Sequence, residues 1–199
     1  LMNVPNILTV FRILLTPLFI YLLFNDFLFS NFFALVVFVL ASITDAYDGY
    51  YARKYNVETE IGNFLDPLAD KILVSSAFIS FHLLGLIELW MVAVILFRDL
   101  LITLLRIIMK RNGYSLKTSR MAKSKTAVQL SLIIFTLVFL ALDSYEQNSL
   151  LIISNFILEN NIVYNATIAV SFFTIYTGLR YLQNNYDLIK KIIWNENTN

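Results

Sequence analysis

Residues 31–86 read NFFALVVFVLASITDAYDGYYARKYNVETEIGNFLDPLADKILVSSAFISFHLLGL, which is two long apolar runs joined by a charged connection. Each run has about 20 residues, the length that an α-helix needs to cross the hydrocarbon core of a bilayer. The charged residues gather where the two runs meet, and the outer ends are apolar. We therefore expect two neighbouring antiparallel membrane helices whose shared end carries the ionisable side chains.

Similar apolar stretches recur along the rest of the chain. Of the 199 residues, 58% are hydrophobic and only 15% are charged, and the mean hydropathy is +0.69, which is too apolar for an ordinary soluble domain. The apolar segment 150–158 is too short to span a bilayer and is expected to belong to a connection. The sequence predicts an all-α, polytopic membrane protein, a single domain over residues 1–199, with about six transmembrane helices near residues 7–24, 31–53, 64–86, 89–109, 125–142 and 162–182.

The distribution of Lys and Arg predicts how these helices are oriented. The connections around residues 25–31, 85–88 and 143–161 contain no Lys or Arg, whereas the opposite helix ends carry many. Because basic connections stay on the cytoplasmic side, both termini and the charged end of the 31–86 pair are predicted to be cytoplasmic. The expected location is therefore the cell membrane, with a site that faces the cytoplasm. The tail 186–194 mixes apolar residues with two lysines and suits the membrane surface.

The composition also excludes several kinds of site. Lys and Arg together number 15 and Asp and Glu 14, so the net charge gives no reason to expect a nucleic-acid partner. The chain has no Cys, which excludes disulfides, thiolate catalysis and zinc–thiolate sites. The one histidine, His82, falls towards the uncharged end of its span, far from the charged connection.

Four carboxylates belong to the charged connection: Asp45, Asp48, Asp66 and Asp70. An ionisable side chain in or beside a membrane span is costly and indicates a functional site. The spacings of three and four residues place each pair on one face of its helix. Converging carboxylates require protons, basic partners or bound cations. Oxygen ligands without His or Cys select Mg²⁺, Mn²⁺ or Ca²⁺, so we expect a two-metal site.

Helix capping is the alternative interpretation of these carboxylates. Asp66 precedes Pro67 and therefore resembles an N-cap residue at a helix start. Capping explains neither Asp45 nor Asp48, so the metal site is the favoured interpretation, and Asp66 can serve both purposes.

The residues between the carboxylates suit a phosphorylated ligand. Asp45, Gly49 and Arg53 step by four along one helix face, and Arg is the natural bidentate partner of a phosphate. Gly49, Ala52 and Gly62 are small where a nucleotide would come close.

Together these residues form the pattern D-x2-D-G-x2-A-R-x8-G-x3-D-x3-D, which resembles the signature of the CDP-alcohol phosphatidyltransferase family at all eight fixed positions. The resemblance implies a metal-dependent enzyme that moves a phosphatidyl group from a CDP-linked lipid to a small alcohol, and it implies a homodimer among membrane lipids. It implies that Asp45, Asp48 and Asp66 bind two divalent cations, Mg²⁺ or Mn²⁺, and that Asp70 combines metal binding with general-base catalysis. The residues that it implies for the CDP pocket are Gly49, Ala52, Arg53 and Gly62.

Three further segments resemble one branch of this family. They are NVPNILTVFRILLTPLF at 3–19, FRDLLITLLR at 97–106 and AKSKTAVQ at 122–129, where Ala122 stands in place of an expected Gly. The reaction that this implies joins CDP-diacylglycerol and sn-glycerol 3-phosphate to give phosphatidylglycerophosphate and CMP, in phospholipid biosynthesis.

Basic residues near the charged end independently favour an anionic acceptor. Arg98 and Arg106 lie inside a predicted span, and Lys123 and Lys125 lie at the entry of the next one. These four cations are our candidates for binding the acceptor phosphate. Asp99 can neutralise Arg98, so Arg106, Lys123 and Lys125 are the stronger three.

Two alternatives for the function remain on the sequence alone. The same chemistry can serve another acceptor, such as inositol phosphate, serine or phosphatidylglycerol. A cation transporter would also place carboxylates within the membrane. Against transport, the four carboxylates of the motif gather at one end of the predicted spans, and a transport path needs groups towards the other end.

Overall fold

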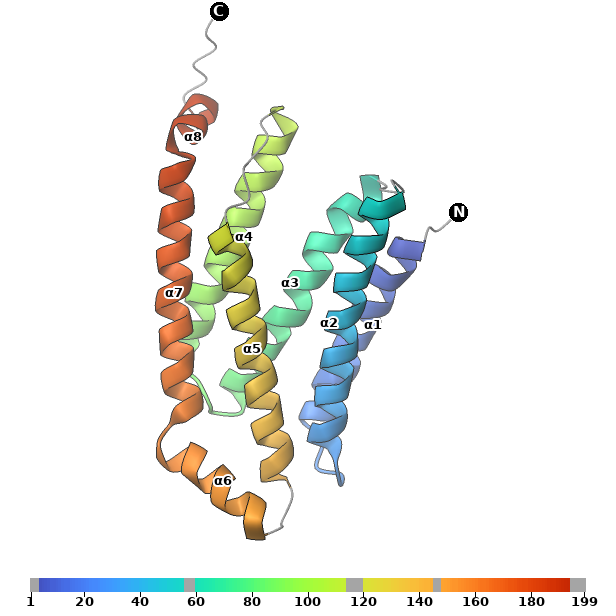
Figure 1. Ribbon diagram of the computed structural model, residues 1–199, viewed down its shortest axis with the longest axis vertical. Coiled ribbons are helices and arrows are strands. Elements are labelled where there is room, and N and C mark those ends of the chain that lie inside the picture. Colours follow the sequence, from blue (N-terminus) through green and yellow to red (C-terminus); the bar gives the residue numbers. More distant parts are fainter. Residues whose placement is uncertain (1–3, 56–59, 114–119, 145–147, 194–199) are drawn as a thin grey trace, which may run out of the picture.

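The computed structural model describes residues 4–55, 60–113, 120–144 and 148–193, with side chains for 9–44, 71–109, 112–113, 124–144 and 150–190. All regular structure within these ranges is helical, which confirms the predicted all-α class. Six long helices run along the molecule, and two short ones, α6 and α8, lie at its opposite ends (Figure 1). The helices are α1 Val4–Leu23, α2 Ser30–Tyr55, α3 Glu60–Leu83, α4 Leu89–Arg111, α5 Arg120–Asp143, α6 Asn148–Glu159, α7 Ile162–Asn184 and α8 Tyr186–Ile193.

The turn between α3 and α4 shows how the sequence reverses the chain. Gly85 has a φ of 76°, in the left-handed region that glycine adopts without a steric penalty. The Leu86 N–H donates to the Phe81 carbonyl at 3.0 Å, and the Gly85 N–H donates to the His82 carbonyl at 2.9 Å. These bonds satisfy carbonyl groups at the end of α3, as in a Schellman motif. A tight turn results, and α4 runs back beside α3.

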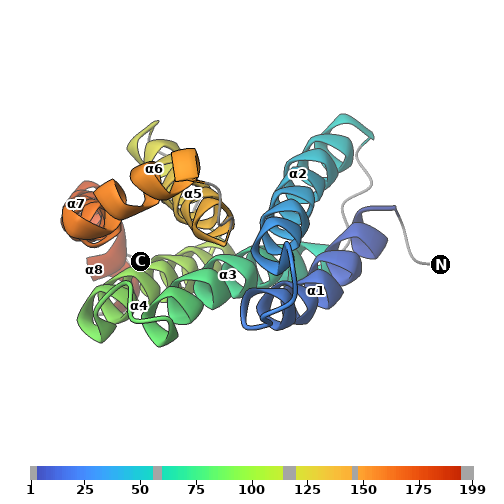
Figure 2. The same ribbon diagram turned by 90° about the horizontal axis from the view of Figure 1, so that it is seen from below.

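The helices pack as two groups that share a core. Contacts join α1, α2 and α3 in one group and α4, α5 and α7 in the other, while α3 with α4 and α2 with α5 connect the groups (Figure 2). Phe19 of α1 and Phe38 of α2 are fully buried, with ring centroids 5.5 Å apart. Such an aromatic pair stabilises a contact by about 0.5–1.5 kcal/mol beyond its buried area.

The surface is apolar, and the interior combines an apolar core with buried cations. Large apolar side chains point outwards, including Leu14, Leu28 and Phe172, which are 64%, 73% and 62% exposed. Meanwhile Arg12 and Lys125 are almost completely buried. Apolar groups facing lipid and polar groups facing the bundle interior are the arrangement expected in a bilayer. The chain is therefore a membrane protein.

The six long helices match the six predicted spans to within a few residues. By length and composition, two described stretches are long and apolar enough to cross a bilayer, Ser124–Asp143 and Ile162–Asn184. Described parts of four other helices give shorter apolar stretches, Thr9–Leu23, Ser30–Thr44, Lys71–Leu83 and Leu150–Glu159. Charged residues interrupt α4. Six crossings and a cytoplasmic position of the termini therefore stay predictions.

The short helices occupy segments that the sequence set apart. The apolar segment 150–158 lies in α6, which links α5 to α7 at one end of the bundle (Figure 1). The Ser154 hydroxyl donates to the Asp143 carboxylate and so fastens α6 to the end of α5. The tail 186–193 forms α8, and residue 194 lies outside the described residues.

Candidate active site

The signature residues lie on two helices. The last part of α2 carries the first five, and the first half of α3 carries the other three. These two helix ends lie at the same end of the bundle (Figure 1). Carboxylates supplied by two such helix ends are a donor set that suits hard divalent cations. Nine predicted site residues lie in stretches whose side chains the structure does not describe, so their roles stay predictions: Asp45, Asp48, Gly49, Ala52, Arg53, Gly62, Asp66, Asp70 and Lys123.

The described residues contain no group of three or more His, Cys, Asp or Glu that could hold a metal ion. His82 faces the α3–α4 turn, where its Nδ1 lies 2.9 Å from the Ile87 carbonyl oxygen. That turn is at the opposite end of α3 from the signature carboxylates. The geometry agrees with the expectation that His82 lies away from the site.

A buried ion cluster joins α3, α4 and α5. The Lys125 ammonium contacts the Asp99 carboxylate directly. Arg98 Nη1 lies 3.3 Å from Asp99 Oδ1, and Lys71 Nζ lies 3.9 Å from Asp99 Oδ2. Asp99 is 4% exposed and Lys125 is 1% exposed. These four residues, the Asp99 cluster, set one carboxylate against three cations and therefore carry an excess of positive charge.

Helix α7 packs against Arg98. Arg98 Nη2 lies 3.5 Å from Thr177 Oγ1, at the long limit of a hydrogen bond. The next residue is Gly178, and a Cβ there would stand 3.0 Å from Arg98 Cγ. A residue without a side chain lets α7 approach Arg98 this closely without displacing it. Arg98 is thus held between Asp99 on its own helix and the buried face of α7.

Further polar atoms lie on the helix faces beside the Asp99 cluster. On α5, Gln129 follows Lys125 by one helical turn. On α7, Thr174 lies three residues before Thr177, and Tyr181 lies four residues after it. A buried polar atom left without a partner costs about 1–3 kcal/mol. Four such atoms have no hydrogen-bond partner among the described residues, and all four can donate: Arg98 Nε, Gln129 Nε2, Thr174 Oγ1 and Tyr181 Oη.

The structure brings together only some of the predicted phosphate-binding cations. Arg98 and Lys125 meet at Asp99. Arg106 lies about 12 Å farther along α4 and is exposed. Lys123 belongs to the first turn of α5. The sequence suggested Asp99 as the partner of Arg98, and the structure adds Lys125 in more direct contact with the same carboxylate.

Two charged residues of the interior were not selected from the sequence. Lys71 directly follows Asp70, and its ammonium reaches the Asp99 cluster. Arg12 of α1 is fully buried, although its place in the sequence suits the membrane surface equally well. The signal in the sequence was a basic residue in an apolar helix. This signal does not distinguish a side chain that points into the bundle from one that reaches the membrane surface.

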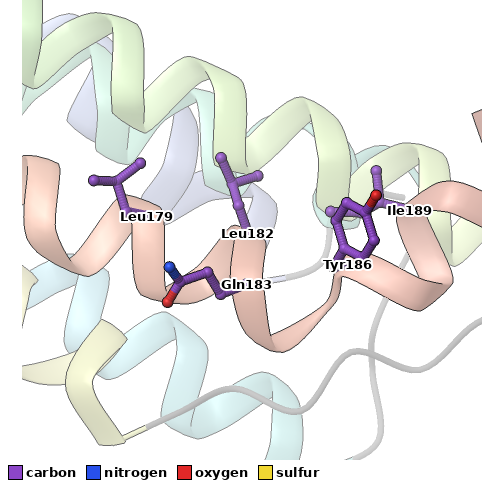
Figure 3. Close-up of a pocket in the computed structure, with 5 residues that line it drawn as sticks. All are labelled: Leu179, Leu182, Gln183, Tyr186 and Ile189. Carbon is purple, nitrogen blue, oxygen red and sulfur yellow. The ribbon is translucent and has the colours of Figure 1, made fainter.

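An apolar pocket lies apart from these charges. Leu179, Leu182, Gln183, Tyr186 and Ile189 line it where α7 continues into α8 (Figure 3). Its lining contains no charged side chain and no member of the Asp99 cluster. We therefore assign no phosphate chemistry to this pocket.

Fold and site together define a helical membrane protein with an ion cluster between α3, α4 and α5. The sequence model of the family described as CDP-alcohol phosphatidyltransferase matches residues 2–177. The chain belongs to this family, which confirms the resemblance found in the signature residues.

Known relatives agree with this assignment. A CDP-diacylglycerol–glycerol-3-phosphate 3-phosphatidyltransferase of Bacillus subtilis (strain 168) is 32% identical over 94% of this chain and 97% of its own length. Enzymes with the same name from Wigglesworthia glossinidia brevipalpis and Rickettsia bellii (strain RML369-C) are 36% and 38% identical, over 69% and 73% of this chain and 78% of their own lengths.

Proposed function

We propose that this protein transfers a phosphatidyl group from CDP-diacylglycerol to sn-glycerol 3-phosphate, giving phosphatidylglycerophosphate and CMP in phospholipid biosynthesis. Family membership and the names of the relatives support this reaction. The observation that favours an anionic acceptor is the positive charge of the Asp99 cluster. The cluster is connected to the signature, since its member Lys71 directly follows Asp70 in the sequence.

We assign the acceptor phosphate to the four basic residues Arg98, Arg106, Lys123 and Lys125. A phosphate brought to the Asp99 cluster would balance its excess positive charge, which an acceptor without a phosphate, such as serine, would not do. An ammonium has three donors and a guanidinium has five. Lys125 and Arg98 can therefore contact Asp99 and a phosphate at the same time.

The donor is assigned to the signature residues. Asp45, Asp48, Asp66 and Asp70 are proposed to hold two divalent cations, Mg²⁺ or Mn²⁺, and the oxygen donor set fits such ions. Bound there, the ions would neutralise charge on the pyrophosphate and on the leaving CMP. The residues proposed for the CDP pocket are Gly49, Ala52, Arg53 and Gly62.

The reaction follows as one displacement at phosphorus. Asp70 accepts the proton of the acceptor hydroxyl, whose oxygen bonds to the phosphorus that carries the lipid. The bond from that phosphorus to the CMP oxygen breaks, and CMP leaves. The basic residues hold the acceptor by its phosphate, so that the hydroxyl is oriented towards the reacting phosphorus. No covalent enzyme intermediate is needed.

The proposed topology places this chemistry at the cytoplasmic surface of the cell membrane. We assign six crossings to α1–α5 and α7, within one domain over residues 1–199. The start of α1 and the end of α8 lie at the same end of the bundle as the signature helix ends (Figure 1). The acyl chains of the donor then stay in the bilayer while the cytidine enters from the cytoplasm. A homodimer is proposed from the family resemblance.

A panel of acceptors tests the proposal. The purified protein, supplied with CDP-diacylglycerol and Mg²⁺ or Mn²⁺, is expected to release CMP with glycerol 3-phosphate and not with serine, inositol phosphate or phosphatidylglycerol. Equal release with one of these would keep the family chemistry and refute the assigned acceptor. Ion flux in liposomes without CMP release would support the transporter alternative instead.

A further inference from the structure

The stability of the fold does not require the buried Asp99–Lys125 ion pair. Both side chains are almost fully buried, and removing two charges from water costs several kcal/mol per ion. Replacing such a pair with apolar residues of similar volume is often neutral or stabilising. Packing of α4 against its neighbours therefore does not explain why a carboxylate occupies position 99.

Among the described residues, the surroundings of Asp99 hold more hydrogen-bond donors than acceptors. Three cations share its one carboxylate. The nearby faces of α5 and α7 add buried donors that have no partner among the described residues, on Gln129, Thr174 and Tyr181. An oxyanion in this region could accept from the buried donors on Arg98, Gln129, Thr174 and Tyr181 that have no partner among the described residues.

We propose that Asp99 is a positioning residue of the acceptor site. Its carboxylate holds Lys125 and Arg98 so that their remaining N–H groups meet the phosphate of the acceptor. The carboxylate also reaches Lys71, which directly follows Asp70 on α3. This inference rests on the proposed function.

Kinetics of the purified full-length enzyme test this role. Asp99→Asn keeps the size of the side chain and removes its charge, so Lys125 loses its counter-ion. The KM for glycerol 3-phosphate is expected to rise by about tenfold or more, because a charge-assisted contact is lost. The KM for CDP-diacylglycerol should stay within about twofold, since Asp99 acts through the acceptor contacts. Asp99→Glu, which retains the charge, should recover part of the acceptor affinity.

A double-mutant cycle separates positioning from mere stabilisation. Because Asp99 acts partly through Lys125, Asp99→Asn added to Lys125→Gln should raise the acceptor KM by a smaller factor than Asp99→Asn does in the unaltered enzyme. The matched control is Asp143→Asn, which removes the carboxylate that binds Ser154 at the other end of α5. This control should leave both KM values unchanged, even where it lowers the melting temperature.

Three results would overturn the inference: an unchanged or lower acceptor KM in Asp99→Asn, an equal rise for both substrates, or additive effects in the cycle. If Asp99→Asn fails to fold, Asp99→Glu carries the test through a several-fold rise in the acceptor KM, and an unchanged KM would refute the role. The proposed function itself would fail in a different experiment: the unaltered enzyme would release no CMP when glycerol 3-phosphate is added.

Discussion

Gly178→Ala probes how closely α7 approaches Arg98. The added Cβ would lie 3.0 Å from Arg98 Cγ, whereas two carbon atoms prefer a separation of about 3.5–4.0 Å. The Arg98 side chain must therefore give way by a few tenths of an ångström. Its contacts to Asp99 at 3.3 Å and to Thr177 at 3.5 Å are already long. We expect the displacement to break at least the contact to Thr177.

Two opposing effects set the change in stability. Inserting a methyl group into a packed site costs about 1–3 kcal/mol, while alanine stabilises a helix interior by about 1 kcal/mol relative to glycine. The expected net loss is about 0–2 kcal/mol. The effect on function should be larger, because a misplaced Arg98 loses a contact to the acceptor phosphate. A loss of about 1.4 kcal/mol corresponds to a tenfold rise in the KM for glycerol 3-phosphate.

The assay measures CMP release at varied glycerol 3-phosphate in four proteins: the unaltered enzyme, Gly178→Ala, Arg98→Ala and the double variant. In the Arg98→Ala background nothing remains for the new methyl group to displace, so Gly178→Ala should have no further effect on the acceptor KM. An equal rise in both backgrounds would show that Gly178 acts through the backbone of α7. An unchanged KM in Gly178→Ala would refute the displacement of Arg98, and an unchanged KM in Arg98→Ala would refute the contribution of Arg98 to acceptor binding.

Three further predictions concern the proposed site. Asp66→Ala should abolish turnover while the protein still inserts and purifies, because a metal ligand is lost; near-normal activity at saturating Mg²⁺ or Mn²⁺ would contradict this. Asp70→Asn should lower kcat by about 10²–10⁴-fold with partial retention of CDP-lipid binding, and complete loss of binding would indicate that Asp70 is mainly a metal ligand. Arg106→Gln should raise the acceptor KM by about tenfold to a hundredfold without changing the donor KM, and equal losses for both substrates would move Arg106 to the donor pyrophosphate.

The sequence predicted the helices well because each one is a local feature. Apolar runs of the length of a bilayer located the six long helices, and the short run 150–158 was correctly separated from them. The signature residues were recognised for the same reason, since their spacing lies within one continuous window. Their helices are described, whereas the roles of their side chains remain predictions.

The sequence could not predict which charges meet. Asp99 and Lys125 are 26 residues apart, and Arg98 and Thr177 are 79 apart, so these contacts depend on how the helices pack. Helix periodicity shows which residues share a face, but it does not show which neighbour that face contacts. Asp99 therefore appeared as a local partner of Arg98, and its contact with Lys125 required the structure.

The most direct test of the proposed reaction is a balance of its products. The purified protein is incubated with CDP-diacylglycerol, isotopically labelled glycerol 3-phosphate and Mg²⁺ or Mn²⁺, and both products are quantified by mass spectrometry. We predict CMP and labelled phosphatidylglycerophosphate in equal amounts, and neither product when a chelator removes the divalent cations. CMP formed without labelled lipid, or no CMP at all, would contradict the proposed transfer.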